Sequence, residues 1–405
     1  MRIIYLHQYF NTPDMPGGTR SYEMARRLVA AGHEVHMVTT WWRDVTEERD
    51  WFETVEAGIH VHWLPVLYSN DMVYRDRIVS FLRFAFSSAR KAASLHGDVI
   101  FATSTPLTIA LPGIYASLRK RIPMVFEVRD LWPEIPVAIG ALKSPLLIKL
   151  AQLLELAAYR FSKHIIALSP GMKDGVVKTG YPQEKVTIIP NSCDIDLFDV
   201  PKQYGVEFRS RYDWLGDRPL VTYAGALGFI NGVGYLVQLA RRVLEFDPEI
   251  RFLVVCKGKE TQKVKETAET LGVLNKNFFM ISEMPKREMP YVLSATDITI
   301  SLVINLKVLW DNSANKFFDS LAAGRPIAIN HDGWQADLLR KTGAGLVLDP
   351  TDLDKSANIL LQAIKDKAWM EKAGLAAKRL ARDEFSRDML AKRLEAVLRS
   401  AAKKT

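Results

Sequence analysis

The sequence predicts an α/β protein with two doubly wound halves, and three features of the 405-residue chain support this fold class. Short apolar runs alternate with segments of helical periodicity along the whole chain, which is typical of parallel sheets covered by helices. The same alternation starts again near residue 220, after a stretch of turn formers and mixed charges. The length also exceeds what one compact core usually holds.

Composition limits the class of protein. Hydrophobic residues make up 48% of the chain and charged residues 25%, as in ordinary soluble globular proteins. The cysteines, Cys193 and Cys256, have no metal-ligand spacing, so we expect a reducing, cytoplasmic setting. There is no run of 18 apolar residues and no signal-peptide pattern at the N-terminus, so no membrane span is expected.

The net charge of +8 is concentrated near the C-terminus. From Lys365 onward there are 12 Lys/Arg and 6 Asp/Glu residues. A basic surface attracts nucleic acid, anionic lipid or phosphorylated substrates. The chain lacks zinc-finger, RNA-recognition and basic DNA-reading patterns, so no nucleic-acid partner is expected. An anionic membrane surface or a lipid-diphosphate acceptor fits better, although a simple effect on solubility would account for the same charge.

The first half opens with a strand–loop–helix–strand unit. Residues 2–6 predict a strand, the following loop ends in Gly17-Gly18, and residues 21–31 and 34–40 predict a helix and a second strand. Glycines between a strand and a helix lie where α/β sheets bind ligands. Their spacing is not G-x-G-x-x-G, so a dinucleotide site is disfavoured. His7 belongs to this loop, as a site residue or as a loop-stabilising one.

Two further segments of the first half carry charge in informative places. Arg129 and Asp130 follow the predicted strand 124–128, and charges at the tip of a buried strand are costly unless they work in a cleft. An ion pair between them that fixes the loop is the alternative. The predicted helix 74–95 is basic and amphipathic with aromatic residues, so it suits an anionic membrane. A helix packed on the core with solvated arginines gives the same pattern.

The second half repeats the pattern. A strand at 220–223, a glycine turn from Gly225 to Gly228 and a helix at 232–245 would let backbone N–H groups approach a diphosphate. Further strands are expected at 250–256, 278–281, 297–302 and 343–348, and a final helix at 379–398. We therefore predict domains at 1–199 and 200–380, with residues 381–405 returning to the first domain.

The stretch from Lys307 to Trp334 is the most informative. It predicts a helix at 314–323, capped by Asn312 or Ser313 and stopped by Gly324. Asn312, Asn315, Lys316 and Asp319 share one face of this helix. A cation and polar groups at a helix N-terminus suit a diphosphate and a sugar, although an ordinary amphipathic helix with a solvated face looks the same.

These motifs resemble a known family. Asp311 precedes Asp319 by eight positions, which resembles the E-x7-E signature of the retaining glycosyltransferase family 4, with the GT-B fold of two Rossmann-like domains facing across a cleft. The sequences 313–319 (SANKFFD), 17–20 (GGTR) and 129–134 (RDLWPE) resemble a subgroup of bacterial surface-polysaccharide transferases that includes the WbuB-like fucosamine transferases.

The resemblance implies roles for individual residues. Asp319 would bind the nucleotide ribose and Asp311 the donor sugar, with Lys316 and Asp130 completing the catalytic set. The chain has no Arg or Lys after Gly225, where relatives carry one, so the phosphate charge would be met elsewhere, by Lys316, Lys307, Lys257 or Lys259. The expected donor-binding residues are Gly225, Gly228, Lys257, Glu283, Met284, Lys307, Asn315, Lys316 and Asp319. The expected acceptor and phosphate-loop residues are Gly17, Gly18, Arg20 and Arg129.

The resemblance also implies an activity. We expect a retaining transferase that moves a sugar, such as an N-acetylated amino or deoxy sugar, from a UDP-sugar to a lipid-linked acceptor of the undecaprenyl-diphosphate type or to a saccharide. The setting would be bacterial surface-polysaccharide biosynthesis (O-antigen, lipopolysaccharide or capsule) on the inner face of the cell membrane. No metal is expected, because no D-x-D motif stands where a metal would clamp a diphosphate. A nucleotide-sugar epimerase and a non-catalytic sugar-nucleotide-binding protein are the alternatives.

Overall fold

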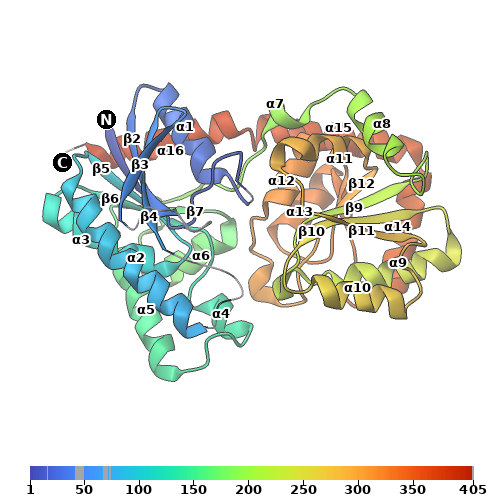
Figure 1. Cartoon of the computed structure of the whole chain (residues 1–405), viewed down its shortest axis with the longest axis horizontal. Coiled ribbons are helices and arrows are strands. Elements are labelled where there is room, and N and C mark those ends of the chain that lie inside the picture. Colours follow the sequence, from blue (N-terminus) through green and yellow to red (C-terminus); the bar gives the residue numbers. More distant parts are fainter. Residues whose placement is uncertain (16, 42–49, 67–71, 73, 404–405) are drawn as a thin grey trace. The chain divides into compact units, whose positions relative to one another are not determined.

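The computed structural model describes residues 1–15, 17–41, 50–66, 72 and 74–403, in two compact units (Figure 1). Unit 1 comprises Met1–Pro190 and Asp388–Thr405, and unit 2 comprises Asn191–Arg387. The first unit therefore ends at Pro190, before the predicted boundary at residue 199. The irregular excursion predicted at 41–50 lies largely outside the described residues, as do the side chains of Tyr74, Arg75 and Arg77.

Unit 1 is built on an eight-stranded sheet in the order β3-β4-β2-β1-β5-β6-β7-β8, parallel except for the β3–β4 pair. The strands are β1 (Arg2–Leu6), β2 (Glu34–Trp41), β3 (Phe52–Glu56), β4 (Ile59–Pro65), β5 (Val99–Thr103), β6 (Met124–Val128), β7 (His164–Ala167) and β8 (Val186–Ile188). The sequence did not predict β3, which lies at the edge of the sheet with no fully buried residue, so it lacks the apolar pattern of the other strands.

Helices cover both faces of this sheet (Figure 1). Ile4 and Leu6 of β1 face the first core, and Ile3 and Tyr5 face the second. The first face carries α2 (Tyr74–Ser94), α3 (Ala110–Lys120), α5 (Pro145–Arg160) and α6 (Pro170–Lys178). The second carries α1 (Arg20–Ala30) and α16 (Arg387–Ala402), while the short α4 (Glu134–Ala138) follows β6.

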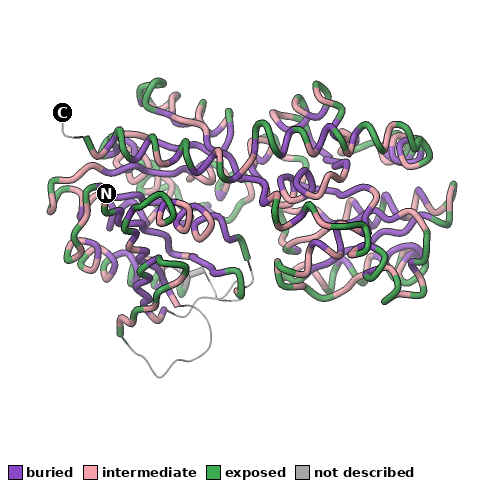
Figure 2. Tube along the Cα trace, turned by 90° about the horizontal axis from the view of Figure 1, so that it is seen from above, coloured by how far each residue is buried: buried purple, intermediate pink, exposed green. Residues whose placement is uncertain are grey.

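Unit 2 contains a six-stranded parallel sheet in the order β11-β10-β9-β12-β13-β14. The strands are β9 (Leu220–Ala226), β10 (Arg251–Lys257), β11 (Phe278–Ser282), β12 (Ile298–Ser301), β13 (Ile327–Ile329) and β14 (Gly345–Val347). One apolar cluster packs α9 (Gly234–Phe246), α10 (Thr261–Thr270) and α14 (Leu353–Lys365) against this sheet. Other clusters hold α7 (Ile195–Phe198), α8 (Gln203–Ser210), α11 (Met289–Ala295), α12 (Asn315–Ala322), α13 (Trp334–Thr342) and α15 (Lys367–Asp383). Buried and exposed positions alternate along the helices, as expected for helices with one face on a sheet (Figure 2).

The predicted final helix at 379–398 is wrong, because two helices meet within that range. Helix α15 ends at Asp383 and α16 begins at Arg387. Between them, the Cys193 N–H donates to the Phe385 carbonyl at 2.8 Å, and the Arg387 N–H donates to the Cys193 carbonyl at 3.2 Å. These bonds to a residue far away in the sequence interrupt the helix, so local periodicity could not predict the break.

Helix α12 begins one residue later than predicted and has no side-chain cap. Ala314 is its N-cap residue, and the Ser313 hydroxyl instead accepts from the Asn191 N–H at 3.0 Å. The Asn312 side-chain oxygen accepts from the Ala314 N–H at 3.2 Å, which shapes the turn into the helix. Gly324 follows the helix with φ of +64°, the left-handed conformation that its predicted role as the helix stop requires.

Candidate functional site

The side chain of Lys316 reaches from α12 to the glycine turn after β9. A Cβ atom added at Gly225 would lie 2.9 Å from Cε and 3.3 Å from Nζ of Lys316. The ammonium donates to the Tyr223 hydroxyl at 3.1 Å and lies 4.6 Å from the centre of that ring. A glycine at position 225 thus leaves the space that Lys316 occupies. The glycine turn after β9 contains no basic residue, and Lys316 of α12, about ninety residues later, supplies the positive charge there.

Lys316 carries its charge at an energetic cost. Burial lowers the pKa of its ammonium to about 8, and no carboxylate opposes the shift. The ammonium contacts the hydroxyl and the ring of Tyr223, and both interactions stabilise a cation less than an anion would. A diphosphate at the glycine turn would supply that missing negative charge. Tyr223 could not be predicted as a site residue, because it lies within the apolar pattern of β9.

Asp319, one turn further along α12, belongs to a charged network. Its carboxylate lies 3.7 Å from the Lys286 ammonium, which also donates to Asp194 at 2.6 Å. Arg387 bonds the same Asp194 carboxylate. Burial raises the pKa of Asp319, and the nearby Lys286 opposes this shift. Lys286 was not among the predicted site residues, although it follows the end of strand β11, where site residues gather.

The remaining donor-site candidates lie in separate places around the same sheet edge. The Lys257 ammonium donates to Glu283 at 2.8 Å across the ends of β10 and β11, and both side chains are exposed. Met284 packs against the cluster around Leu253 and Phe279. Gly228 donates its N–H to the Asn231 side chain at 3.1 Å.

The other candidates flank α12. Asn315 is its first residue, Asp311 lies partly buried just before it, and Lys307 is exposed in the preceding 3-10 turn. The structure therefore brings Gly225 and Lys316 into contact, and pairs Lys257 with Glu283. Among the described residues, Lys307 has no direct contact with the Gly225–Lys316 pair or with the Lys257–Glu283 pair.

In unit 1, polar residues gather at the carboxyl ends of β1, β5 and β6. The Arg129 guanidinium lies 3.2 Å from Nε2 of His7, and its backbone N–H donates to the Ser104 hydroxyl at 3.0 Å. Burial lowers the pKa of His7 well below its usual value, and Arg129 and Arg20 add to this shift. Because a guanidinium only donates, His7 is neutral, accepts at Nε2 and carries its proton on Nδ1.

Asp130, next to Arg129, has the properties of a proton acceptor. Burial raises the pKa of its carboxyl to about 6, although the Arg129 charge acts in the opposite direction. A carboxylate with a pKa near neutrality can take a proton during a reaction at physiological pH. No hydrogen bond ties Asp130 to Arg129, and only their electrostatic interaction appears among the described residues.

Arg20 lies elsewhere than the phosphate loop to which the sequence analysis assigned it. The loop itself has a φ of +116° at Gly17, and the Asn11 side-chain amide donates to the Gly18 carbonyl at 3.5 Å. The Arg20 guanidinium is buried with Glu127 at 2.7 Å and also donates to the carbonyls of Ile189 and Pro190. With its donors engaged inside unit 1, Arg20 serves the fold, and we do not retain it as a phosphate ligand.

Several buried polar atoms at and beside His7 have no hydrogen-bond partner in the part of the chain that the structure describes. They are Nδ1 of His7 and both polar side-chain atoms of Gln8, whose side chain is about 1% exposed. A buried polar atom without a partner costs free energy, so a bound molecule at this edge would relieve the cost. Gln8 was not among the predicted site residues, although polar residues that follow an apolar strand closely often belong to a site.

Metal-ligand geometry is not evident in the described ranges, where no group of three or more His, Cys, Asp or Glu side chains is placed to hold an ion. The chain does contain two Asp-x-Asp triplets, at 194–196 and 352–354. Asp194 is bonded to Lys286 and Arg387, and the Asp352 side chain accepts from the Lys355 N–H as a helix cap.

Comparison with known proteins adds two domain families and several relatives. Residues 17–192 match the glycosyl transferase 4-like domain, and residues 207–380 match the glycosyl transferases group 1 family. The chain is 22% identical over 287 residues to the probable glycosyltransferase WbjE of Pseudomonas aeruginosa, with 70% of each protein covered. It is 24% identical over 252 residues to the putative glycosyltransferase YtcC of Bacillus subtilis, covering 58% of this chain and 60% of that protein.

Solved structures share the whole fold at low sequence identity. The Anabaena protein Alr3699/HepE, in complex with UDP and glucose, matches with a TM-score of 0.74 and 16% identity over 99% of this chain and 100% of its own. An Escherichia coli protein described as trehalose-6-phosphate, bound with UDP-2-fluoro glucose, matches with a TM-score of 0.75 and 12% identity over 100% of both chains.

Proposed function

Because the chain belongs to the glycosyltransferases of the GT-B fold, with one domain from each matched family, we propose that it is a retaining transferase that uses a UDP-sugar. The contact between Lys316 and the Gly225 turn carries the proposal. It joins backbone N–H groups, a helix N-terminus and a cation that has no carboxylate partner among the described residues. Together these groups fit a nucleoside diphosphate.

In the proposed reaction, the bond between the anomeric carbon of the sugar and the diphosphate breaks. Negative charge then grows on the leaving phosphate oxygen, and the Lys316 ammonium stabilises it. Attack by the acceptor hydroxyl on the same face of the sugar retains the anomeric configuration. Lys316 contributes most where the charge is largest, so it lowers the barrier more than it strengthens binding of the donor.

Asp319 and Asp311 orient the donor in this proposal. Asp319 accepts hydrogen bonds from the ribose hydroxyls, and Lys286 favours its ionised form. Asp311 contacts the hydroxyls of the transferred sugar, which we expect to be an N-acetylated amino or deoxy sugar. Lys257 and Glu283 mark the strand ends where the base would lie.

The acceptor side of the proposal rests on Asp130, Arg129 and His7. The carboxylate of Asp130 would take the proton of the attacking hydroxyl, since its pKa of about 6 leaves it ionised at pH 7. Arg129, together with the Gly17-Gly18 loop, would hold a phosphate of the acceptor. The Nδ1–H of His7 and the Gln8 amide remain available for acceptor hydroxyls.

We further propose a lipid-linked acceptor and a peripheral position on the membrane. Val79, Leu82 and Phe86 follow one face of α2 and are 58%, 39% and 66% exposed. An exposed apolar face on a basic helix suits the membrane interface. None of the described helices is long and apolar enough to cross a membrane. Flotation with phosphatidylglycerol or phosphatidylcholine vesicles tests this, and equal binding to both would contradict it.

The proposed activity is tested with the purified chain in two steps. Thermal unfolding with UDP, GDP, ADP and dTDP should show the largest stabilisation with UDP, because ligands that bind only the folded state raise its stability. A panel of UDP-sugars is then incubated with and without acceptors, and released UDP and the sugar products are measured. Retained anomeric configuration in a glycoside product supports the proposal. Binding without turnover indicates a binding protein, and an epimerised donor indicates an epimerase.

A further inference from the structure

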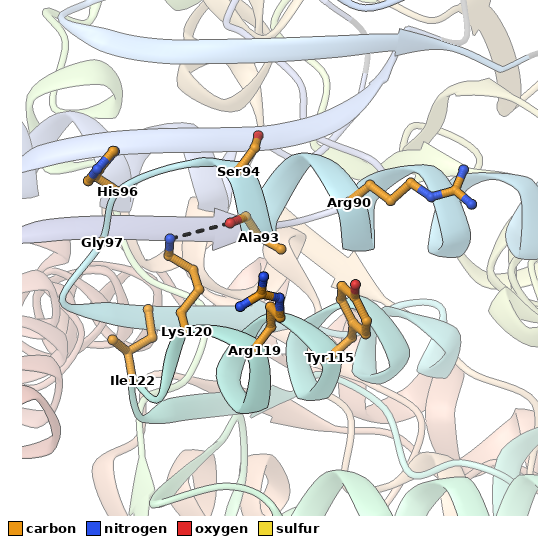
Figure 3. Close-up of a pocket in the computed structure, with 9 residues that line it drawn as sticks. All are labelled: Arg90, Ala93, Ser94, His96, Gly97, Tyr115, Arg119, Lys120 and Ile122. Atoms are coloured by element: carbon orange, nitrogen blue, oxygen red, sulfur yellow. Dashed lines mark hydrogen bonds between the residues drawn. The ribbon is translucent and has the colours of Figure 1, made fainter.

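A concave site lies in unit 1, at the end of the sheet opposite the candidate acceptor residues. The cavity has a volume of about 510 Å³ and lies between the C-terminal ends of α2 and α3 (Figure 3). His96 and Gly97 line it just before β5 begins, and Ile122 lines it just before β6. Ser104 and Arg129 follow the other ends of these same strands. Five-residue strands separate the two places by about 15 Å, so this is a distinct site.

The polar lining of this cavity is basic. Arg90 comes from α2, Arg119 and Lys120 come from α3, and no lining residue carries a carboxylate. Arg119 and Lys120 rise from α3 toward α2, and Lys120 donates to the Ala93 carbonyl at 3.3 Å (Figure 3). That bond uses one of the three ammonium donors, so the other two are left for another partner.

The placement of these cations at helix ends explains only part of the pattern. Cations near a helix C-terminus are favoured by the macrodipole, by about 0.3–1 kcal/mol each. Other cations nearby are also paired with acids, however: Lys91 with Glu53 at 2.8 Å and Arg2 with Glu34 at 3.0 Å. Arg90 and Arg119 have no such ion pair within the described part of the chain. The cavity therefore concentrates positive charge without compensation.

We propose that this cavity binds a phosphate group, carried by a small phosphate ester or by a phospholipid headgroup. A guanidinium presents parallel N–H groups that match two phosphate oxygens, and an ammonium adds a point charge. Tyr115 contributes a hydroxyl donor and an aromatic ring, and Ile122 contributes apolar surface at the other end of the lining (Figure 3). A volume of about 510 Å³ is larger than a phosphate ion needs, which favours a phosphate ester.

The proposal is tested by calorimetric titration of the full chain with glycerol 3-phosphate in saturating UDP, so that the donor site is occupied. The key variants are Arg119→Gln and Lys120→Gln. Arg160→Gln is the matched control, because Arg160 is an exposed arginine at the C-terminal end of α5 that does not line the cavity. We expect Arg119→Gln to weaken binding about tenfold, the equivalent of about 1.4 kcal/mol, with Arg160→Gln within about twofold of wild type. UDP affinity should not change in any variant, which separates this site from the donor site.

Vesicles distinguish the two sources of phosphate. If a lipid headgroup is the ligand, Arg119→Gln lowers binding to phosphatidylglycerol vesicles more than Arg160→Gln does. If a soluble ester is the ligand, the two variants bind vesicles equally and differ only in calorimetry. Either result supports the site. Equal behaviour of Arg119→Gln and Arg160→Gln in both assays, with melting temperatures unchanged, would overturn it.

Discussion

Replacing Lys316 with methionine tests whether this lysine serves a ligand or the fold. Methionine is unbranched and reaches as far as Cε of lysine, so the space beside Gly225 stays filled while the charged Nζ is removed. We expect the variant to be more stable than wild type at pH 7 and to transfer sugar at least about tenfold more slowly, because a contact that strengthens as the diphosphate leaves is lost.

The stability gain follows from the lowered pKa. A shift from 10.5 to about 8 means that the folded state disfavours the charged lysine. At about 1.4 kcal/mol per pKa unit, the penalty is up to roughly 3 kcal/mol. The contacts with Tyr223 return part of it, about 0.5–2 kcal/mol, so we expect a net gain of about 1–2 kcal/mol.

The pH dependence has a definite sign. Below pH 8 the lysine is charged in both the folded and the unfolded states, so the full penalty applies. As the pH rises from 8 toward 10.5, the folded protein releases the proton first and the penalty disappears. The advantage of Lys316→Met should therefore be largest at pH 7 and shrink by pH 9.5.

Urea unfolding at pH 7 and 9.5 measures this difference, and donor hydrolysis measures turnover. Lys276→Met removes an exposed lysine of the same unit and should change neither quantity. If Lys316→Met is less stable than wild type at pH 7 and turns over donor at the wild-type rate, the ligand role of Lys316 is refuted.

Three further changes probe the other parts of the account. Asp319→Asn should weaken UDP binding about ten- to a hundredfold in calorimetry, because a hydrogen bond to a charged group contributes about 1.5–3 kcal/mol, while the melting temperature changes little. Wild-type turnover should fall as the pH drops through about 6, where Asp130 gains a proton, and Asp130→Asn should be slow at every pH without this limb. Arg20→Met should lower the free energy of unfolding by about 3–5 kcal/mol, because it leaves the buried Glu127 carboxylate unpaired, and adding Glu127→Gln should recover part of the loss.

Each of these has an outcome that counts against it. Unchanged UDP affinity in a folded Asp319→Asn protein would remove the ribose role. A pH–rate profile that stays the same in Asp130→Asn would assign the limb to another group. A stable Arg20→Met protein with weaker donor binding would restore Arg20 to the phosphate loop.

The predicted GT-B fold is confirmed. It could be predicted because the sequence patterns that indicate it are local. Alternating strands and helices, and the glycine stop at Gly324, follow from periodicity and backbone conformation. The edge strand β3 was not predicted, because it has no fully buried residue and therefore no apolar pattern.

Long-range partners explain the site residues that the sequence could not assign. Arg20 follows two glycines in a loop, which suggested a phosphate ligand, but its carboxylate partner Glu127 lies 107 positions away. Lys316 was assigned to phosphate from its place on a helix, whereas its contact with Gly225 depends on how β9 and α12 pack together. Sequence reasoning thus found residues near the sheet edges, and only the three-dimensional arrangement separated those that serve the fold from ligand candidates.

A crystal structure of the chain with bound UDP would show whether Lys316 and Asp319 bind the nucleotide. We expect a diphosphate oxygen within hydrogen-bond distance of the Lys316 ammonium beside Gly225, and the ribose hydroxyls hydrogen-bonded to Asp319. UDP bound away from α12, with Lys316 still bonded only to Tyr223, would contradict it.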